Sequence, residues 1–322
     1  MDLPVSIIEK IKLLDEKYSA MGQDLNAYLE GLLYADYITY WNYIHLDTLL
    51  SLQTPLTNIP DEEIFIMYHQ ITELYFKLCL HEMNQVASHS ALTIELMTQR
   101  VQRVNRYFDA LTHSFDIMSQ GMEKEQFLKF RMSLLPASGF QSAQYRTIEI
   151  MATSFRNLMH KDFREKYEEN PEVGEFGQMF EHIYWKEGAT ELATGKKTLT
   201  LRQFEKKYSA LIIQAAIDHK GNNFWMLYKR FEIADGKDGK LKSALRELDQ
   251  NVNVNWPLAH FKTAVAYLQK DPRDIAATGG TNWQKYLPPR FQRRIFYPAL
   301  WSDEEKSEWG KQWVSKNVFG EG

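Results

Sequence analysis

Apolar side chains recur every three or four residues along most of the chain, which is the spacing of amphipathic helices. The clearest stretch is 61–86, where the apolar positions are Ile64, Met67, Tyr68, Ile71, Leu74, Tyr75 and Leu78. Asp61 follows Pro60 and is expected to cap this helix. Alternation of apolar and polar residues, the pattern of a half-buried strand, is rare and short. The pattern therefore predicts an all-α protein.

The same spacing predicts three further helices. One covers 122–135 and ends at Pro136, because the residue before a proline disfavours helical geometry. A long helix covers about 139–160. A third begins near residue 255, with Asn255 as its cap and Pro257 in the first turn, where proline is tolerated.

Residues 161–210 differ in character from the rest of the chain. They are rich in Lys and Glu and are interrupted by Gly and Pro. We expect an inserted accessory helical segment here, within a single all-helical domain that covers 1–322. No internal repeat and no low-complexity tract divides the chain further.

Charge and apolar runs exclude several classes of partner. The 42 acidic and 38 basic residues give a formal net charge of −4, whereas a general nucleic-acid binder needs a basic face. No apolar run approaches the roughly 18–20 residues that span a bilayer. The single cysteine, Cys79, excludes an internal disulfide and a cysteine-based zinc site. We expect a soluble, cytoplasmic protein without a nucleic-acid or membrane partner.

Aromatic residues are unusually frequent, with 8 Trp, 17 Tyr and 18 Phe. Two interpretations are open at this stage. The rings form a core that is simply rich in aromatics, or some of them wall a pocket for a flat ligand.

His69 lies on the helix over 61–86, between Phe65 and Phe76 on a face next to the aliphatic stripe. Apolar surroundings favour the neutral imidazole, which can donate or accept a hydrogen bond. The alternative is a core histidine bonded to a backbone carbonyl.

Arg131 shares a helical face with Phe127 and Leu134. A guanidinium among apolar neighbours needs a partner, and its planar fork suits a carboxylate. No acidic residue lies on the same face one turn away. The carboxylate belongs either to another part of the fold or to a ligand.

His260 lies off the aliphatic stripe of its helix and shares a face with Ala264 and Tyr267. The small Ala264 leaves room for something flat beside the imidazole, so His260 is a candidate axial haem ligand. A core histidine without a ligand is the alternative. The Cys-x-x-Cys-His motif is absent, and any haem is therefore expected to be bound non-covalently.

Four motifs occur in order along the chain. They are Tyr40-x-x-Tyr43-x-His-Leu-Asp-x-Leu-Leu-Ser-x-Gln53, Asp61-Glu-x-x-Phe65-Ile-x-x-His69-Gln-x-x-Glu73-Leu, Pro136-Ala-Ser-Gly-Phe-Gln-Ser142-x-Gln-Tyr-Arg146 and Thr278-Gly-Gly280. With these motifs the chain resembles the tryptophan 2,3-dioxygenase family over most of its length. The second and third motifs are specific.

The resemblance implies an all-helical bundle that encloses haem b, with His260 as the axial ligand of the iron. It implies that His69 is the catalytic distal histidine, near the N–H of the substrate indole. The implied substrate-binding residues are Tyr40, Tyr43, Phe65, Phe127, Arg131, Leu134, Ser138 and Thr278.

The implied reaction cleaves the indole C2–C3 bond of L-tryptophan with O₂ and gives N-formylkynurenine, as in tryptophan catabolism through the kynurenine pathway. The resemblance also implies a homotetramer in which Tyr40 and Tyr43 reach the site of a neighbouring subunit. Three alternatives stay open: a related haem monooxygenase acting on a tryptophan derivative, a non-catalytic haem-based sensor, and a helical interaction protein without a cofactor.

Overall fold

A computed structural model describes residues 3–36, 38–134, 141–190, 196–236, 239–268 and 294–311. Within these residues all the regular elements are helices. β pairing is limited to two isolated bridges, Met159–Ile183 and Thr190–Lys197. The predicted all-α fold class is therefore confirmed. No helix among the described residues is long and apolar enough to cross a membrane.

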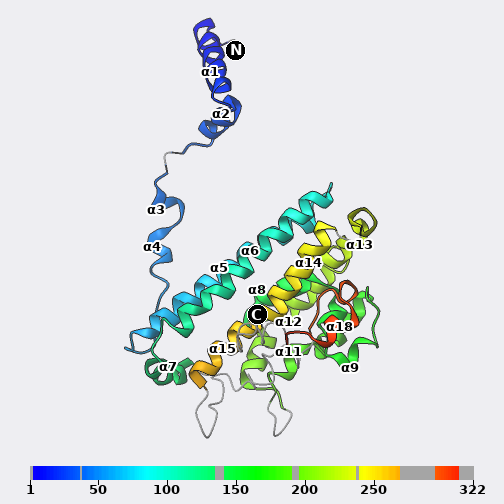
Figure 1. Cartoon of the computed structure of the whole chain (residues 1–322). Coiled ribbons are helices and arrows are strands. Elements are labelled where there is room, and N and C mark those ends of the chain that lie inside the picture. The colour runs from blue at the N-terminus through cyan, green and yellow to red at the C-terminus, as the bar shows by residue number, and fades with distance from the viewer. Residues whose placement is uncertain are drawn as a thin grey trace. The chain divides into compact units, whose positions relative to one another are not determined.

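The chain divides into two compact units, Met1–Thr54 and Pro55–Gly322. The first unit holds four helices: α1 Val5–Ala20, α2 Leu25–Leu33, α3 Tyr40–Tyr43 and α4 Leu46–Leu49 (Figure 1). Asp24 caps α2, because its side chain accepts a hydrogen bond from the backbone N–H of Asn26 at 2.9 Å. Leu25 is the one buried apolar side chain among the described residues of this unit.

The second unit contains the remaining described helices. The first eight are α5 Asp61–Ser88, α6 Ile94–Ser119, α7 Lys124–Phe130, α8 Ala143–Ala152, α9 Lys161–Arg164, α10 Phe176–Glu181, α11 Tyr184–Glu187 and α12 Leu199–Asp218. After them come α13 Phe224–Asp235, α14 Lys240–Gln250, α15 Trp256–Leu268 and α18 Asp303–Ser307. Short 3₁₀ helices cover Arg131–Leu134, Phe155–Leu158, Val173–Glu175 and Pro298–Leu300.

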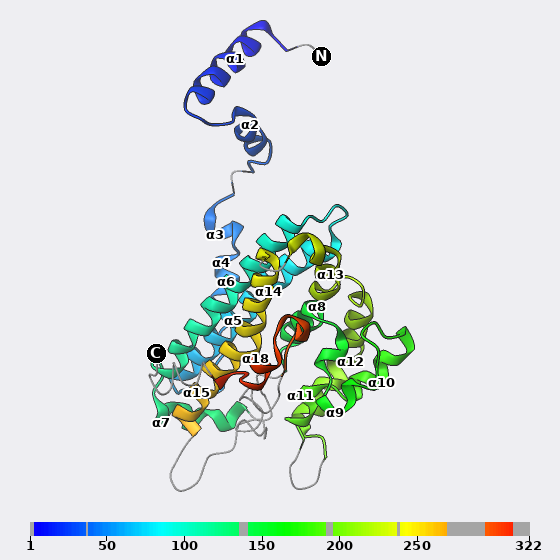
Figure 2. The same cartoon turned by 45° about the vertical axis from the view of Figure 1, so that its right-hand side comes forward.

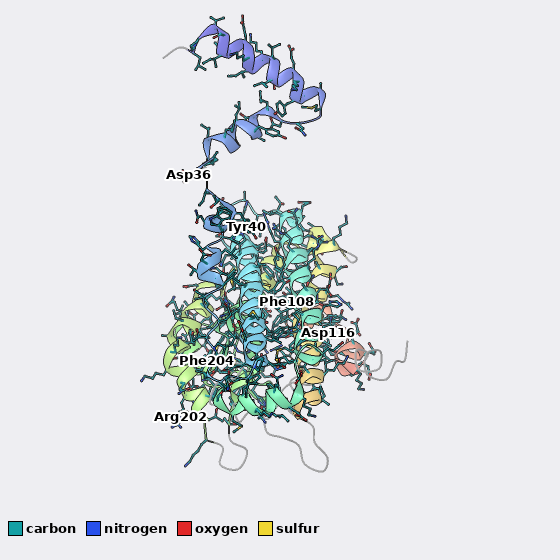
Figure 3. The ribbon with its side chains drawn as sticks, turned by 90° about the vertical axis from the view of Figure 1, so that its left-hand side faces the viewer. Asp36, Tyr40, Phe108, Asp116, Arg202 and Phe204 are labelled. Carbon is teal, nitrogen blue, oxygen red and sulfur yellow. The ribbon has the colours of Figure 1, made fainter. Side chains whose placement is uncertain are left out.

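The helices α5 and α6 form a long pair that organises the second unit. α6 packs along α5 and also contacts α14 and α15, and Figures 1 and 2 show these helices side by side. Thr93 begins α6, since its hydroxyl accepts from the N–H of Leu96 at 3.2 Å. On α6 the apolar side chains at every third or fourth position are buried, as for Phe108 (Figure 3). On α5 the buried face carries Phe76, Cys79 and Met83. The apolar positions predicted from the sequence are largely exposed there, namely Met67, Ile71, Leu74 and Leu78.

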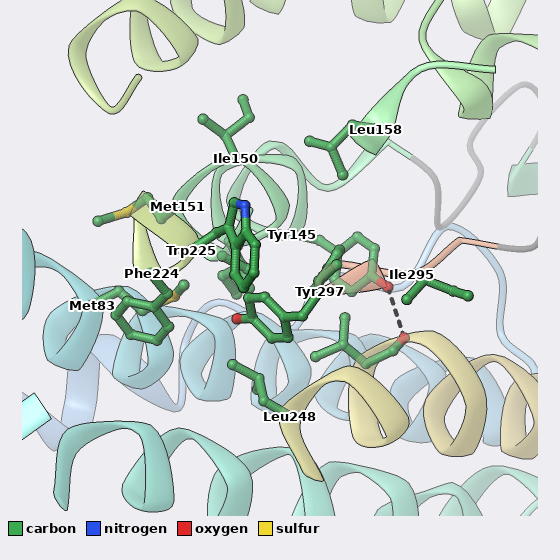
Figure 4. Packing of buried hydrophobic residues seen from close by; sticks show 14 of the residues in the cluster. Met83, Tyr145, Ile150, Met151, Leu158, Phe224, Trp225, Leu248, Ile295 and Tyr297 are labelled. Atoms are coloured by element: carbon green, nitrogen blue, oxygen red, sulfur yellow. Dashed lines mark hydrogen bonds between the residues drawn. The ribbon is translucent and has the colours of Figure 1, made fainter. Parts of the chain in front are cut away.

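The main hydrophobic core lies between α5, α6, α8, α12, α13 and α14. Tyr145, Trp225 and Tyr297 are among its aromatic members, and Figure 4 shows how their rings pack together. The hydroxyl of Tyr145 donates to the carbonyl of Val252 at 3.4 Å.

Residues 161–210 are helical over much of their described length, with α9, α10, α11 and the start of α12. Many of their large side chains are buried in the main core: Phe176, Met179, Phe180, Ile183, Tyr184, Trp185, Leu201 and Phe204. This segment therefore contributes directly to the core of the second unit.

Asp61 does not cap α5, contrary to the sequence prediction. Pro60 occupies the cap position, and the carboxylate of Asp61 instead accepts from the backbone N–H of Glu123 at 2.6 Å. Glu62 is also committed outside the helix, because its carboxylate accepts from the N–H groups of Leu56 and Thr57 at 2.8 and 2.7 Å. Both acids therefore tie neighbouring loops to the first turn of α5.

The helix predicted over 139–160 is shorter than expected. Its described part is α8, which ends at Ala152, and Thr153 is extended. The hydroxyl of Thr153 donates to the carbonyl of Phe296, and that of Ser154 donates to the carbonyl of Glu169. These bonds to distant backbone replace the helix. In the helix predicted over 122–135, α7 gives way to a 3₁₀ turn at Arg131.

Asn255 does not begin a helix, so that prediction is wrong as well. A π-helix over Asn251–Asn255 joins α14 to α15 without a break. The side chain of Asn255 donates to the side-chain oxygen of Asn251 at 2.9 Å. Pro257 lies directly after this wider turn, in the first turn of α15.

A buried polar network fastens the end of the described chain to the bundle. Glu149 of α8 accepts from Arg146 at 2.8 Å and from Arg294 at 2.6 Å. Asp249 of α14 accepts from the N–H groups of Phe296 and Tyr297 at 2.9 and 3.1 Å. Since every charge is paired or hydrogen-bonded, the network can lie inside the protein.

Candidate active site

A second cluster of buried side chains, here called the site cluster, lies where α5, α6, α7 and α15 meet. Its buried members are Tyr68, Phe115, Met118, Met122, Phe127, Phe130, Ala259 and Tyr267. Partly buried side chains pack against it, among them Phe65, Leu134 and Trp256. Both histidines singled out in the sequence are carried by helices of this cluster.

His69 of α5 is held by the helix that carries it. Its Nδ1 lies 2.7 Å from the carbonyl oxygen of Phe65, one turn earlier. A carbonyl only accepts, so Nδ1 carries the proton, and in the neutral ring Nε2 is left as a hydrogen-bond acceptor. Burial among protein atoms lowers the pKa of His69, and the bond to Phe65 and the charge of Glu73 offset part of this effect. His69 is therefore neutral at pH 7.

His260 of α15 is also neutral. Burial among protein atoms lowers the pKa of His260 to about 4, and the nearby His69 adds to the lowering. A neutral imidazole has a nitrogen lone pair, which is what binding to iron requires. The ring of Phe115 of α6 is stacked on the His260 ring, with centroids 5.5 Å apart and planes 20° apart.

The two histidines lie near one another in the second unit. Both side chains are exposed, although surrounding protein atoms desolvate both rings. The pKa of His260 responds to His69, which places the two rings near one another. A neutral histidine beside apolar side chains such as Phe115 fits the protein ligand of a non-covalent haem.

Phenylalanine rings line the His69 side of the site cluster. The ring of Phe65 lies 4.1 Å from the His69 ring, 6.2 Å from Phe127 and 5.7 Å from Phe130, measured between centroids. Phe127 and Phe130 lie edge to face at 5.6 Å. The structure therefore brings Phe65, Phe127 and His69 together, as the sequence predicts, and offers a flat apolar wall beside a hydrogen-bond acceptor.

Arg131 begins the 3₁₀ turn directly after α7, and its residue is 5% exposed. Burial lowers the pKa of Arg131 from its ordinary value. The guanidinium is nevertheless charged at pH 7, because arginine does not lose its proton in the physiological range. A buried cation beside the aromatic wall is suited to an anionic group such as a carboxylate.

The other predicted site residues are distributed unevenly. Leu134 packs against the site cluster. Tyr40 and Tyr43 lie on α3 of the first unit, with 70% and 73% of their surface exposed. Ser138 and Thr278 lie outside the described residues.

Sequence reasoning missed Phe130 and Phe115 as members of this region. Phe130 follows Phe127 by three residues, so helical spacing alone could have identified it. Phe115 is carried by α6 and meets His260 from a point 145 residues earlier in the chain. No local pattern in the sequence indicates such a contact.

The sequence is similar to those of known proteins. A sequence model of the family described as tryptophan 2,3-dioxygenase matches residues 31–269. A tryptophan 2,3-dioxygenase of Caulobacter vibrioides is 30% identical over 288 residues, which are 82% of this chain and 97% of that protein. One of Ruegeria sp. strain TM1040 is 41% identical over 118 residues, which are 36% of this chain, and the match spans 42% of that relative's length.

Proposed function

Because the chain belongs to the tryptophan 2,3-dioxygenase family, we propose that it cleaves the indole C2–C3 bond of L-tryptophan with O₂ and yields N-formylkynurenine. The observation that carries the proposal is the pair of neutral histidines, His69 and His260, which lie near one another beside a phenylalanine wall. In this proposal residues 1–322 act as one haem-binding enzyme.

The proposal includes haem b, held without a covalent bond by His260. The low pKa of His260 supports this assignment, since the ring has its lone pair available at pH 7. When bound, haem supplies the binding and activation of O₂, which no amino-acid side chain provides. The protein contributes the position of the substrate, the exclusion of water and the polarity of the site.

His69 orients the indole ring in this proposal. An indole N–H can only donate a hydrogen bond, and Nε2 of His69 can only accept one. The two groups are therefore matched. Phe65 and Phe127 give the flat faces against which the indole packs, and Leu134 closes the edge of the same wall. The apolar wall also keeps water away from the reacting ring.

Arg131 binds the carboxylate of the amino acid. Its buried position strengthens this interaction, because charges attract more strongly where water is excluded. Two fixed points, one on the indole N–H and one on the carboxylate, determine how the C2–C3 bond is presented. Ser138 and Thr278 stay predicted substrate-binding residues.

A homotetramer completes the site in this proposal, with Tyr40 and Tyr43 supplied by a neighbouring subunit. The large exposed fraction of both tyrosines in the first unit supports a partner for them. The cytoplasmic location predicted from the sequence also stays a prediction, which cell fractionation would test.

The test is mass spectrometry of the product after ferrous, haem-loaded protein is mixed with L-tryptophan and ¹⁸O₂. Two labelled atoms in an opened indole ring are expected. One labelled atom would assign the protein to the monooxygenases. If no product forms and the spectrum of the bound haem does not respond to tryptophan, the protein is a sensor.

A further inference from the structure

Phe115 is the aromatic neighbour of the His260 ring. The two rings are nearly parallel, with planes 20° apart and centroids 5.5 Å apart. Phe115 is 7% exposed, so its ring is enclosed by protein. Within the described part of the chain, no hydrogen bond to the His260 ring accompanies this stacking.

The Phe115 ring is itself fixed from two other helices. Trp256 of α15 lies 4.5 Å away and Tyr68 of α5 lies 5.8 Å away, measured between ring centroids. Tyr68 precedes His69 in the chain, and Trp256 lies one turn before His260. A ring held on several sides has little freedom to turn, and it transmits that restraint to the ring stacked on it.

The orientation of the imidazole plane needs such a restraint. Rotation of a histidine ring about its last side-chain bond has broad minima, so the torsion alone does not fix the plane. Ligating histidines are ordinarily oriented by a hydrogen bond at the second ring nitrogen. Among the described residues, the contact that orients the His260 ring is the flat apolar ring of Phe115.

We propose that Phe115 is a positioning residue that fixes the plane of the His260 imidazole by stacking on it, and thereby the orientation of the haem ligand. The inference rests on the proposed function, since it takes His260 as the axial ligand. It makes the ligand plane depend on α6, whereas the ligand itself is carried by α15.

Comparison of Phe115→Leu with Phe115→Tyr distinguishes the effect of a flat aromatic ring from the effect of side-chain volume. Leucine fills the space with an apolar group but lacks a planar surface, and tyrosine keeps the surface. Phe108→Leu is the matched control, because Phe108 lies two turns earlier on the same helix, is fully buried and packs in the main core against Phe76. Each variant is loaded with haem as the intact chain.

Two measurements do not depend on turnover: the rate of haem loss to an excess of a haem-scavenging protein, and the iron–imidazole stretching band of the ferrous protein in resonance Raman spectra. We expect Phe115→Leu to lose haem about 2- to 12-fold faster, the effect of one aromatic pair, and to show a shifted or broadened band. Phe115→Tyr and Phe108→Leu are expected to resemble the unaltered protein in both measurements.

Equal values for Phe115→Leu and Phe108→Leu would overturn the proposal, as would a tyrosine variant no closer to the unaltered protein than the leucine variant. His260→Ala distinguishes this failure from failure of the proposed function. If His260→Ala impairs haem binding and Phe115→Leu does not, only the positioning role of Phe115 is disproved. If the unaltered chain binds no haem through His260, the proposed function fails first.

Discussion

His69 has one ring nitrogen bonded to the backbone of its own helix, and in the proposed function the other accepts a hydrogen bond from the substrate. The bond to the carbonyl of Phe65 is the one expected of a core histidine, yet the His69 side chain is exposed. The backbone bond confirms one part of the core interpretation, and the contact of His69 with a ligand stays a prediction. The tautomer set by Phe65 makes Nε2 an acceptor, which selects for ligands that donate at that point.

A substrate analogue with sulfur in place of the indole N–H tests this role. We expect the unaltered protein to bind the benzothiophene analogue more weakly than L-tryptophan by about 0.5–1.5 kcal/mol, the net value of one neutral hydrogen bond. In His69→Ala the two ligands should bind equally. Titration of both ligands into both proteins gives the comparison, and an unchanged preference in His69→Ala would exclude the hydrogen bond.

Removal of the guanidinium at Arg131 tests carboxylate binding. Arg131→Ala is expected to weaken L-tryptophan binding by about 2–4 kcal/mol, because the substrate carboxylate is left in a buried site without its counter-charge. Lys129→Ala is the control, since Lys129 is an exposed cation at the end of α7. Isothermal titration with L-tryptophan and with tryptamine, which has no carboxylate, checks the result. Tryptamine affinity should not change, and an equal loss for both ligands would contradict the assignment.

Among the elements, α5 depends at its first turn on a buried carboxylate. Burial acts to raise the pKa of Glu62, but hydrogen bonds from the side chain of Thr57 and the backbone of Leu56 and Thr57 outweigh it and hold the pKa below its ordinary value. A carboxyl whose pKa is lowered by folding stabilises the native state when ionised. This contribution is complete above about pH 4.5 and is lost as the pH falls through the lowered value.

Glu62→Gln removes that contribution. We expect a loss of about 1–3 kcal/mol in the free energy of unfolding at pH 7, the value of hydrogen bonds to a charged group. The difference in the free energy of unfolding between the unaltered protein and Glu62→Gln should decrease below pH 4.5, as Glu62 becomes protonated. Urea denaturation at pH 7 and pH 3.5 measures both effects. Glu63→Gln, an exposed neighbour in the same turn, should change little at either pH.

Elements were predictable where local spacing alone determines them. α5 ends within two residues of the predicted 61–86. Its buried face is the neighbouring one with Phe76, Cys79 and Met83, because tertiary packing and not local spacing decides which face turns inward. The helix predicted over 139–160 fails at Thr153, whose hydroxyl bonds to the carbonyl of Phe296, 143 residues away. The site follows the same division. Phe65 and His69 meet within one helix, whereas Phe115 and His260 meet only through tertiary packing.

For the whole molecule, the division at Thr54 assigns Tyr40 and Tyr43 to the first unit and the site cluster to the second. If these tyrosines serve a neighbouring subunit, then two defective variants can repair one another. Tyr43→Ala retains an intact Arg131, and Arg131→Ala retains an intact Tyr43.

Co-expression of Tyr43→Ala with Arg131→Ala is expected to restore about a quarter of the unaltered activity, since a random assembly joins the two intact parts at about one site in four. Each variant alone should be far less active. The matched control pairs Arg131→Ala with His69→Ala, whose altered residues both lie in the second unit, and should restore nothing. If co-expressed Tyr43→Ala and Arg131→Ala are no more active than either variant alone, the tyrosines belong to the chain's own site or to no site.

The π-helix between α14 and α15 sets the rotational phase of the second helix against the first. A π turn holds one residue more than an α turn, and each residue of an α-helix advances the chain by about 100°. Loss of a single codon within 251–255 would let the whole segment wind as ordinary α-helix. Because the π turn takes up its extra residue within a single turn, the side chains of α15 would keep their phase, and His260 would stay on the face it shares with Phe115. A residue lost from the α-helical part of α14 instead, with no such turn to absorb the change, would rotate α15 by about 100° and carry His260 away from Phe115.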